Sequence, residues 1–193
     1  DYYDLTLDYL ERVAAEGGLY VELLASADHV FNLGMTLKDQ QDALVQAIDE
    51  ARESVGVETR ISQTIVRHYG PDKAIAAAKA IVEHPHPYFT GFQMAGAEDA
   101  HTPADFRPAY DMAAEAGLRC TAHTGEWLGP DSIRETLAAL PMVERLGHGV
   151  RAIHDADLVR ELAERQMPFE VCPGSNNALK VFGSPEEHAL RGL

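Results

Sequence analysis

The sequence predicts an α/β fold built around a parallel sheet, and three observations support this. Short apolar or β-branched segments alternate with longer segments of helical period, at a step of about 30 residues, the size of one βα unit. The short segments are mostly apolar, as in strands buried on both faces. Polar residues and glycines follow their carboxyl ends, where a barrel of parallel strands has its active site. We therefore expect a (β/α)8 TIM barrel.

Six segments have the composition of strands, and each is followed by a segment of helical period. The six expected strands cover residues 19–24, 60–67, 88–94, 119–123, 145–148 and 168–172. An open, doubly wound sheet would share this alternation. No Gly-x-Gly-x-x-Gly follows a strand and no P-loop is present, so the nucleotide-binding open sheets lack their main signature. The barrel is therefore favoured.

The segments between the strands carry the start and stop signals of helices. Residues 1–16 repeat apolar side chains at helical spacing, and Gly17-Gly18 ends the pattern. Thr36 and Asp39 have the spacing of a capping box. Proline is tolerated in the first turn of a helix, and glycine is common just after its end. On this basis helices begin near Pro71, Pro103, Pro130 and Ser184-Pro185, and end near Gly56 and Gly117.

Composition excludes several classes of protein. With 46% apolar residues the chain is suited to a globular core. The 31 acidic against 16 basic side chains give a net charge of −15, which disfavours binding to nucleic acid polymers. No apolar run reaches the roughly 18 residues of a membrane span. The two cysteines and the absence of a recognisable signal peptide lead us to expect a cytoplasmic protein.

Ionisable residues follow two neighbouring strands at the end where barrel chemistry occurs. His123 ends one expected strand, and Glu126 comes one turn later, beside Gly125. His148 ends the next strand, between two glycines. Neutral imidazole is a good ligand for Zn²⁺, and a buried carboxyl can keep its proton at pH 7. The alternatives are a capped strand end with a solvated Glu126 and a His148 bonded to backbone. Together the three residues favour a metal-assisted hydrolytic site.

The motifs around these residues resemble those of the adenosine deaminase family. His123-Thr124-Gly125-Glu126 is similar to the family's His-Ala-Gly-Glu, and residues 145–149 (Arg-Leu-Gly-His-Gly) to Arg-Ile-Gly-His-Gly. Residues 170–176 (Glu-Val-Cys-Pro-Gly-Ser-Asn) resemble Glu-Val-Cys-Pro-Thr-Ser-Asn, and residues 94–98 (Met-Ala-Gly-Ala-Glu) resemble Leu-Ala-Gly-Asp-Glu. The motifs keep the family's order and spacing over almost the whole chain, so the set is specific.

The resemblance assigns a role to several residues. His123 would be a zinc ligand, Glu126 the proton donor to N1 of the purine, and His148 the base that orients the attacking water and helps to deprotonate it. The backbone N–H of Gly96 would bond N3 of the purine. Further candidates for the pocket are Arg67, His68, Ser175 and Asn176.

The reaction that the resemblance implies is zinc-dependent hydrolytic deamination of adenosine and 2′-deoxyadenosine in purine salvage. The partner would be an uncharged small-molecule nucleoside, with neither nucleic acid nor membrane involved. One alternative within the superfamily is a deaminase of adenine or of a modified adenylate. Another, of a different class, is a non-catalytic fragment or binding module on a barrel scaffold. No oligomeric state is predicted.

Two motifs of the resembled family have no counterpart in the sequence. These are the His-x-His of the first strand and the Asp-Asp of the eighth, which supply the other metal ligands. His84-Pro85-His86 has the right spacing, but it precedes a strand and so falls at the opposite end of the barrel. We therefore expect residues 1–193 to form a single partial barrel domain with strands two to seven of eight. Alone, it should hold little metal and lack deaminase activity.

Two further expectations concern residues with no assigned chemistry. Glu98 and Asp99 form a short acidic run, which is typical of a solvated loop. His188 follows the helix start predicted at Ser184-Pro185 and is expected at the surface.

Overall fold

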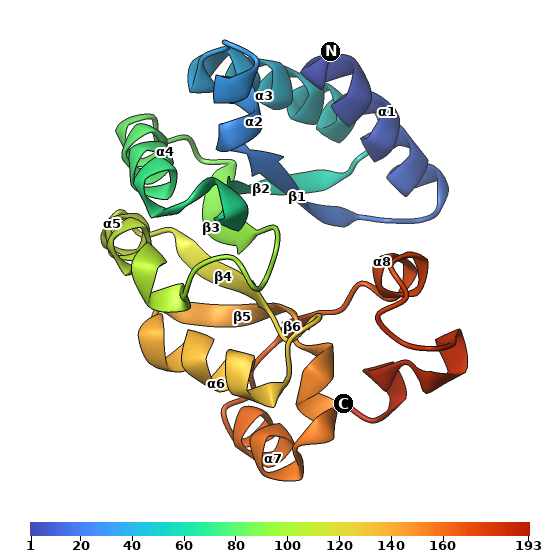
Figure 1. Cartoon of the computed structure of the whole chain (residues 1–193). Helices are drawn as coiled ribbons and strands as arrows, with labels where there is room; N and C mark the ends of the chain where they lie inside the picture. The colour runs from blue at the N-terminus through green and yellow to red at the C-terminus, as the bar shows by residue number, and fades with distance from the viewer.

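The computed structural model describes residues 1–193 and contains one sheet of six parallel strands. The strands are β1 (Tyr20–Ser26), β2 (Glu58–Val66), β3 (Phe89–Ala95), β4 (Arg119–Thr124), β5 (Val143–His148) and β6 (Phe169–Glu170). They lie side by side in chain order, and every neighbouring pair is parallel (Figure 1). All six strands predicted from the sequence are confirmed.

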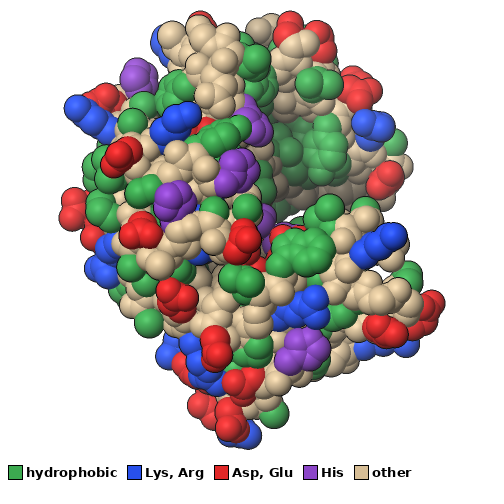
Figure 2. All heavy atoms as spheres, in the orientation of Figure 1, with side chains coloured by type: hydrophobic (Ala, Val, Ile, Leu, Met, Phe, Trp, Pro, Cys, Tyr) green, Lys and Arg blue, Asp and Glu red, His purple; other side chains and the backbone are tan.

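The sheet is curled into an incomplete barrel. Arg145 of β5 forms an ion pair of 2.7 Å with Glu22 of β1, although β1 and β5 are separated by three other strands in the sheet. The same guanidinium lies 3.3 Å from the carboxylate of Glu170 in β6. Such contacts are possible only because the sheet bends back on itself. The space-filling view shows the resulting hollow on the open side of the molecule (Figure 2).

Helices lie between consecutive strands, as in a barrel of βα units, and one further helix precedes the first strand and another follows the last. They are α1 (Tyr2–Ala15), α2 (Ala27–Asn32), α3 (Leu37–Ser54), α4 (Pro71–Glu83), α5 (Arg107–Glu115), α6 (Pro130–Ala139), α7 (Ala156–Glu164) and α8 (Pro173–Ala178). Helices α4 to α7 cover the outer side of the sheet, whereas α8 lies across the open side (Figure 1). None of the helices has both the length and the apolar character needed to cross a membrane.

Most of the predicted helix boundaries are confirmed. Thr36 and Asp39 form the capping box of α3, and Pro71 and Pro130 occupy the first turns of α4 and α6. The helix predicted at Ser184-Pro185 is wrong, because the chain forms only a 3₁₀ turn over Pro185–Glu187. The backbone becomes extended at His188, whose side chain then caps a second 3₁₀ turn, Ala189–Arg191.

Two apolar clusters hold the layers together. The larger has 22 buried residues and lies mainly between β2–β5 and the helices α4 to α7. The smaller has eight and joins α1 and α3 to β1 and β2. Because the larger cluster lies under β4 and β5, it supports the two strands whose ends carry His123 and His148.

We predict that Leu146→Ala destabilises the chain strongly. Leu146 lies in β5, is fully buried, and belongs to the larger cluster, so its truncation leaves a cavity that costs about 2–5 kcal/mol. Leu19→Ala removes the same atoms from a side chain that is 77% exposed and should change stability by less than about 0.5 kcal/mol. Urea unfolding of the two variants measures the difference, and equal losses would contradict this account of the core.

Candidate active site

The ends of β4 and β5 bring His123 and His148 into contact. Thr124 pairs with His148 and His123 with Gly147 in the parallel register. The two imidazole rings meet edge to face, with their centroids 4.9 Å apart. A Cβ atom at position 147 would lie 2.6 Å from Nδ1 of His123, so only glycine leaves room for this ring.

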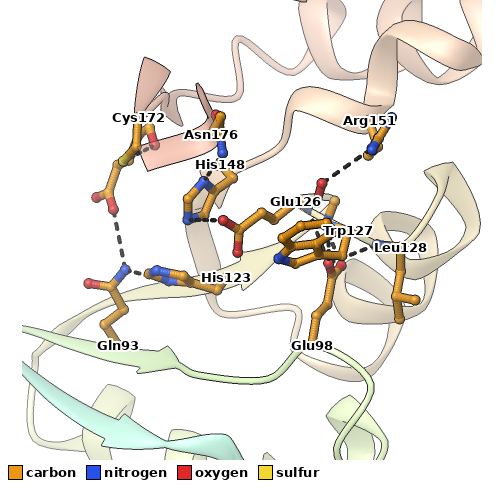
Figure 3. A network of polar contacts seen from close by, with 12 residues as sticks. Gln93, Glu98, His123, Glu126, Trp127, Leu128, His148, Arg151, Cys172 and Asn176 are labelled. Carbon is orange, nitrogen blue, oxygen red and sulfur yellow. Dashed lines mark hydrogen bonds and ion pairs between the residues drawn. The ribbon is translucent and has the colours of Figure 1, made fainter. Parts of the chain in front are cut away.

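Glu126 completes a cluster of three ionisable side chains. Its carboxylate Oε1 lies 3.6 Å from Nε2 of His148, and the side chain is only 12% exposed (Figure 3). Burial, and then the negative charge of Glu98, raise the pKa of Glu126 above its usual value. The sequence placed these three residues together, and the structure does so as well.

Both histidines are held in their neutral forms. Burial, and then the neighbouring His148, lower the pKa of His123 to about 4. Burial also lowers the pKa of His148. The site therefore combines two uncharged imidazoles with a carboxyl whose pKa is raised. Neutral imidazole can bind a metal ion or take part in hydrogen bonding to water.

The carboxylate of Glu98 holds the turn that carries Glu126. It accepts hydrogen bonds from the backbone N–H groups of residues 125, 126, 127 and 128, and from the hydroxyl of Ser132. Burial by itself would raise the pKa of Glu98, but the hydrogen bonds from Ser132 and the backbone outweigh it and lower that pKa. Glu98 therefore remains a buried anion.

The expectation of a solvated loop at Glu98 is wrong. Its side chain is 4% exposed, whereas the neighbouring Asp99 is exposed as expected. The physical reason is the turn after β4, which presents four backbone N–H groups that need an acceptor. Glu98 and the turn at residues 125–128 are almost 30 positions apart in the sequence. The composition of the acidic run therefore does not indicate that Glu98 will be buried.

Two arginines fix the segments on either side of this turn. Arg67, at the end of β2, donates to the backbone carbonyls of Ala100 and His101 in the loop that carries Glu98. Arg151 donates to the carbonyl of Glu126 and to that of Val181. Arg67 was a candidate for the pocket, but its buried guanidinium instead anchors the loop that follows β3.

Gln93 is a site residue that the sequence analysis missed. Its side-chain amide lies 2.9 Å from Nδ1 of His123, and the same amide nitrogen is 3.4 Å from a carboxylate oxygen of Glu170 (Figure 3). The other amide atom, Oε1, is buried without a partner. Gln93 lies within β3 rather than at its end, where polar residues of a barrel site are expected. Its contact fixes the orientation of the His123 ring.

Asn176 and His188 extend the site on the side of His148. The amide Nδ2 of Asn176 lies 3.1 Å from Nδ1 of His148, and Oδ1 of Asn176 lies 3.1 Å from Nε2 of His188. Asn176 is fully buried, which supports its selection as a site candidate. His188 was expected at the surface, but its ring bonds to a residue of the site because the chain turns back after α8.

The remaining candidates have no contact with His123, Glu126 or His148 in the structure. His68 and Gly96 both line a cavity of about 600 Å³ between α1 and the ends of β1 to β3. Gly96 has a φ of +100°, and a Cβ there would lie 2.9 Å from Nδ1 of His68. Ser175 is exposed in α8. The predicted contact of the Gly96 N–H with a purine stays a prediction.

The cluster fits part of a metal site. Residues 1–193 contain no group of three or more His, Cys, Asp or Glu side chains arranged to hold a metal ion. His123 is neutral, and the amide nitrogen of Gln93 donates to its Nδ1 and so fixes the ring. His84 and His86 lie between α4 and the amino end of β3, at the opposite end of the sheet from His123. One ligand position is therefore present, and a complete set is not.

Comparison with known proteins identifies relatives over the whole chain. An adenine deaminase of Agrobacterium fabrum is 43% identical over all 193 residues, which correspond to 59% of its own length. The solved structure of an adenine deaminase from Arthrobacter aurescens matches 99% of the chain with a TM-score of 0.92 and 32% identity. The chain covers 58% of that structure.

A second solved structure is that of an amidohydrolase from Burkholderia ambifaria with bound zinc. It matches 98% of the chain with a TM-score of 0.90 and 27% identity, and the chain covers 53% of it. The chain thus spans somewhat more than half the length of the relatives it matches. The family model for adenosine deaminase matches residues 1–193, and the chain therefore belongs to the adenosine deaminase family.

Proposed function

We propose that this chain carries the acid–base part of the active site of an enzyme that hydrolytically deaminates an adenine-type base. The observation that carries the proposal is the cluster of Glu126, His148 and His123, in which a carboxyl of raised pKa lies beside two neutral imidazoles. The family membership and the adenine deaminases among the relatives support the same reaction class.

The chemistry requires a proton donor to the ring and an oriented water. Glu126, whose pKa is raised by burial and by Glu98, gives a proton from its acid form to N1 of the purine, which makes C6 open to attack. The water oxygen bonds to C6 while His148 orients it. One water proton is transferred to the exocyclic amino group, the bond between C6 and that nitrogen breaks, and ammonia leaves; the other water proton returns to Glu126. The product carries a 6-oxo group, and Glu126 regains a proton before the next cycle.

A divalent metal would supply a more acidic water at this position. We propose His123 as one of its ligands, and the zinc bound to the Burkholderia ambifaria relative suggests zinc as the ion. Because the chain brings one ligand position and no complete set, no step is assigned to the metal. That the chain by itself holds little zinc stays a prediction.

For the substrate, the comparisons favour adenine over adenosine. The sequence motifs predicted adenosine as the substrate, with adenine as an alternative. Two of the relatives named above are adenine deaminases. We predict that the whole enzyme turns over adenine with a kcat/KM at least tenfold above those for adenosine and AMP. Ammonia release from the three compounds at equal concentration measures this. A higher kcat/KM for adenosine than for adenine would contradict this prediction and support adenosine as the substrate.

The second candidate function is a binding module without catalysis, and the incomplete set of metal ligands favours it. Such a module would bind purines without releasing ammonia. The same assay separates the two functions, because the catalytic proposal requires turnover of at least one of the three compounds by the whole enzyme.

We predict that Glu126→Gln abolishes most of the activity of the whole enzyme. The amide keeps the size of the side chain but removes its acidic proton, and loss of a general acid lowers kcat by about 10²–10⁴-fold. Glu115→Gln makes the same change at an exposed position of α5 and should leave kcat unchanged. A Glu126→Gln enzyme with near-normal kcat would exclude Glu126 as the proton donor.

We predict that Glu98→Gln shifts the pH dependence of the whole enzyme. The charge of Glu98 raises the pKa of Glu126, and activity falls as pH rises through that pKa because the proton is lost. Removing the charge lowers the pKa of Glu126, so the alkaline limb of kcat moves to lower pH.

Asp99→Asn is the matched control for this shift, since it removes a charge from an exposed neighbour and should leave the alkaline limb in place. Circular dichroism shows whether each variant is folded. A folded Glu98→Gln enzyme with an unmoved limb would contradict the electrostatic coupling of Glu98 to Glu126.

A further inference from the structure

A chain of hydrogen bonds begins at a backbone N–H and ends at the catalytic cluster. The N–H of Leu190 lies 3.1 Å from Nδ1 of His188. Nε2 of His188 lies 3.1 Å from Oδ1 of Asn176, and Nδ2 of Asn176 lies 3.1 Å from Nδ1 of His148. Nε2 of His148 faces Glu126 (Figure 3).

The first bond in this chain has only one possible direction. A backbone N–H can only donate, so Nδ1 of His188 accepts, and a neutral His188 must carry its proton on Nε2. That N–H then donates to Oδ1 of Asn176. With its oxygen engaged, the amide of Asn176 presents its nitrogen to His148 and donates to Nδ1. Nδ1 of a neutral His148 is therefore unprotonated, and Nε2 carries the proton.

We propose that His188 is a positioning residue, which acts through Asn176 to fix the Nε2–H tautomer and the ring orientation of His148. Nothing in the sequence motifs assigns a role to His188, which lies 40 positions after His148.

Burial makes this arrangement effective. Asn176 is fully buried and His148 is 5% exposed, so bulk water does not compete for their bonds. The ring of His188 packs against that of Phe182, with centroids 4.9 Å apart, which limits its rotation. His148 also has a φ of +64°, a strained conformation for a residue with a side chain, so the ring needs support from its surroundings.

The tautomer has a consequence for the reaction, and this step rests on the proposed function. A neutral His148 that carries its proton on Nε2 offers a donor, not an acceptor, to the space beside Glu126. It therefore orients the attacking water by donating to the water oxygen. The role of proton acceptor, which the family resemblance implies for His148, then has no free nitrogen, because Nδ1 is engaged with Asn176.

The test is the ¹⁵N NMR spectrum of the full chain labelled with ¹⁵N-histidine, without metal or substrate. We expect the Nδ1 signal of His148 in the range of an unprotonated nitrogen and the Nε2 signal in the protonated range. In Asn176→Asp the carboxylate can only accept a hydrogen bond. Nδ1 of His148 must then gain a proton, and its signal should move upfield by tens of ppm. A protonated Nδ1 in the wild type, or an unmoved signal in Asn176→Asp, would overturn the proposal.

Two further variants isolate the part played by His188. His188→Ala removes the donor to Asn176, so the amide can reverse and the two signals of His148 should move toward each other. His188→Gln keeps an N–H near the position of Nε2 and should restore the wild-type spectrum. His84→Ala, an exposed histidine at the end of α4, is the control that leaves the signals of His148 unchanged.

If His188→Ala has the spectrum of the His84→Ala control, His188 has no positioning role. The measurement needs no turnover, so it can succeed while the proposed deaminase activity fails. Conversely, the proposed activity can be found in an enzyme whose His148 carries the other tautomer.

Discussion

The buried carboxylate of Glu98 is the interaction on which the geometry of the site depends. It satisfies four consecutive backbone N–H groups in the turn after β4, and that turn carries Glu126. Arg67 at the end of β2 holds the loop of Glu98, and Arg151 after β5 holds the carbonyl of Glu126. Four neighbouring strand ends are thus joined by bonds from side chains to backbone, which position the acid more rigidly than surface ion pairs would.

The fold could be predicted from the sequence because its signals are local. Strand composition, the step of one βα unit, capping boxes and first-turn prolines each depend on residues close together in the chain. The placement of His123 and His148 also followed, because parallel strands of one sheet end at the same edge. The helix predicted at Ser184-Pro185 was wrong because the prediction used only these local start signals. The chain instead forms a short turn there, and His188 then bonds to Asn176.

The supporting residues could not be predicted, because each acts over a long separation in sequence. Glu98 looks like part of a solvated acidic pair until the turn at residues 125–128 is known to need an acceptor. Gln93 lies inside a strand, and its role depends on the neighbouring β4. One signal was available, namely the two glycines that flank His148, since glycines mark a close approach of side chains or an unusual backbone, and His148 itself has a strained φ of +64°.

The proposed acid–base pair and the proposed metal position are held by different groups of residues. Glu126 and His148 are held entirely by bonds within residues 1–193, from Glu98 and Arg151 on one side and from Asn176 and His188 on the other. The position for a metal has His123 and Gln93 but no second ligand in a suitable group. In the unliganded chain, the environment of Glu126 and the proposed tautomer of His148 therefore depend on hydrogen bonds within residues 1–193. The hydrogen bonds thus preorganise the proposed acid and its neighbouring imidazole, and a bound metal ion would add its own charge to that arrangement.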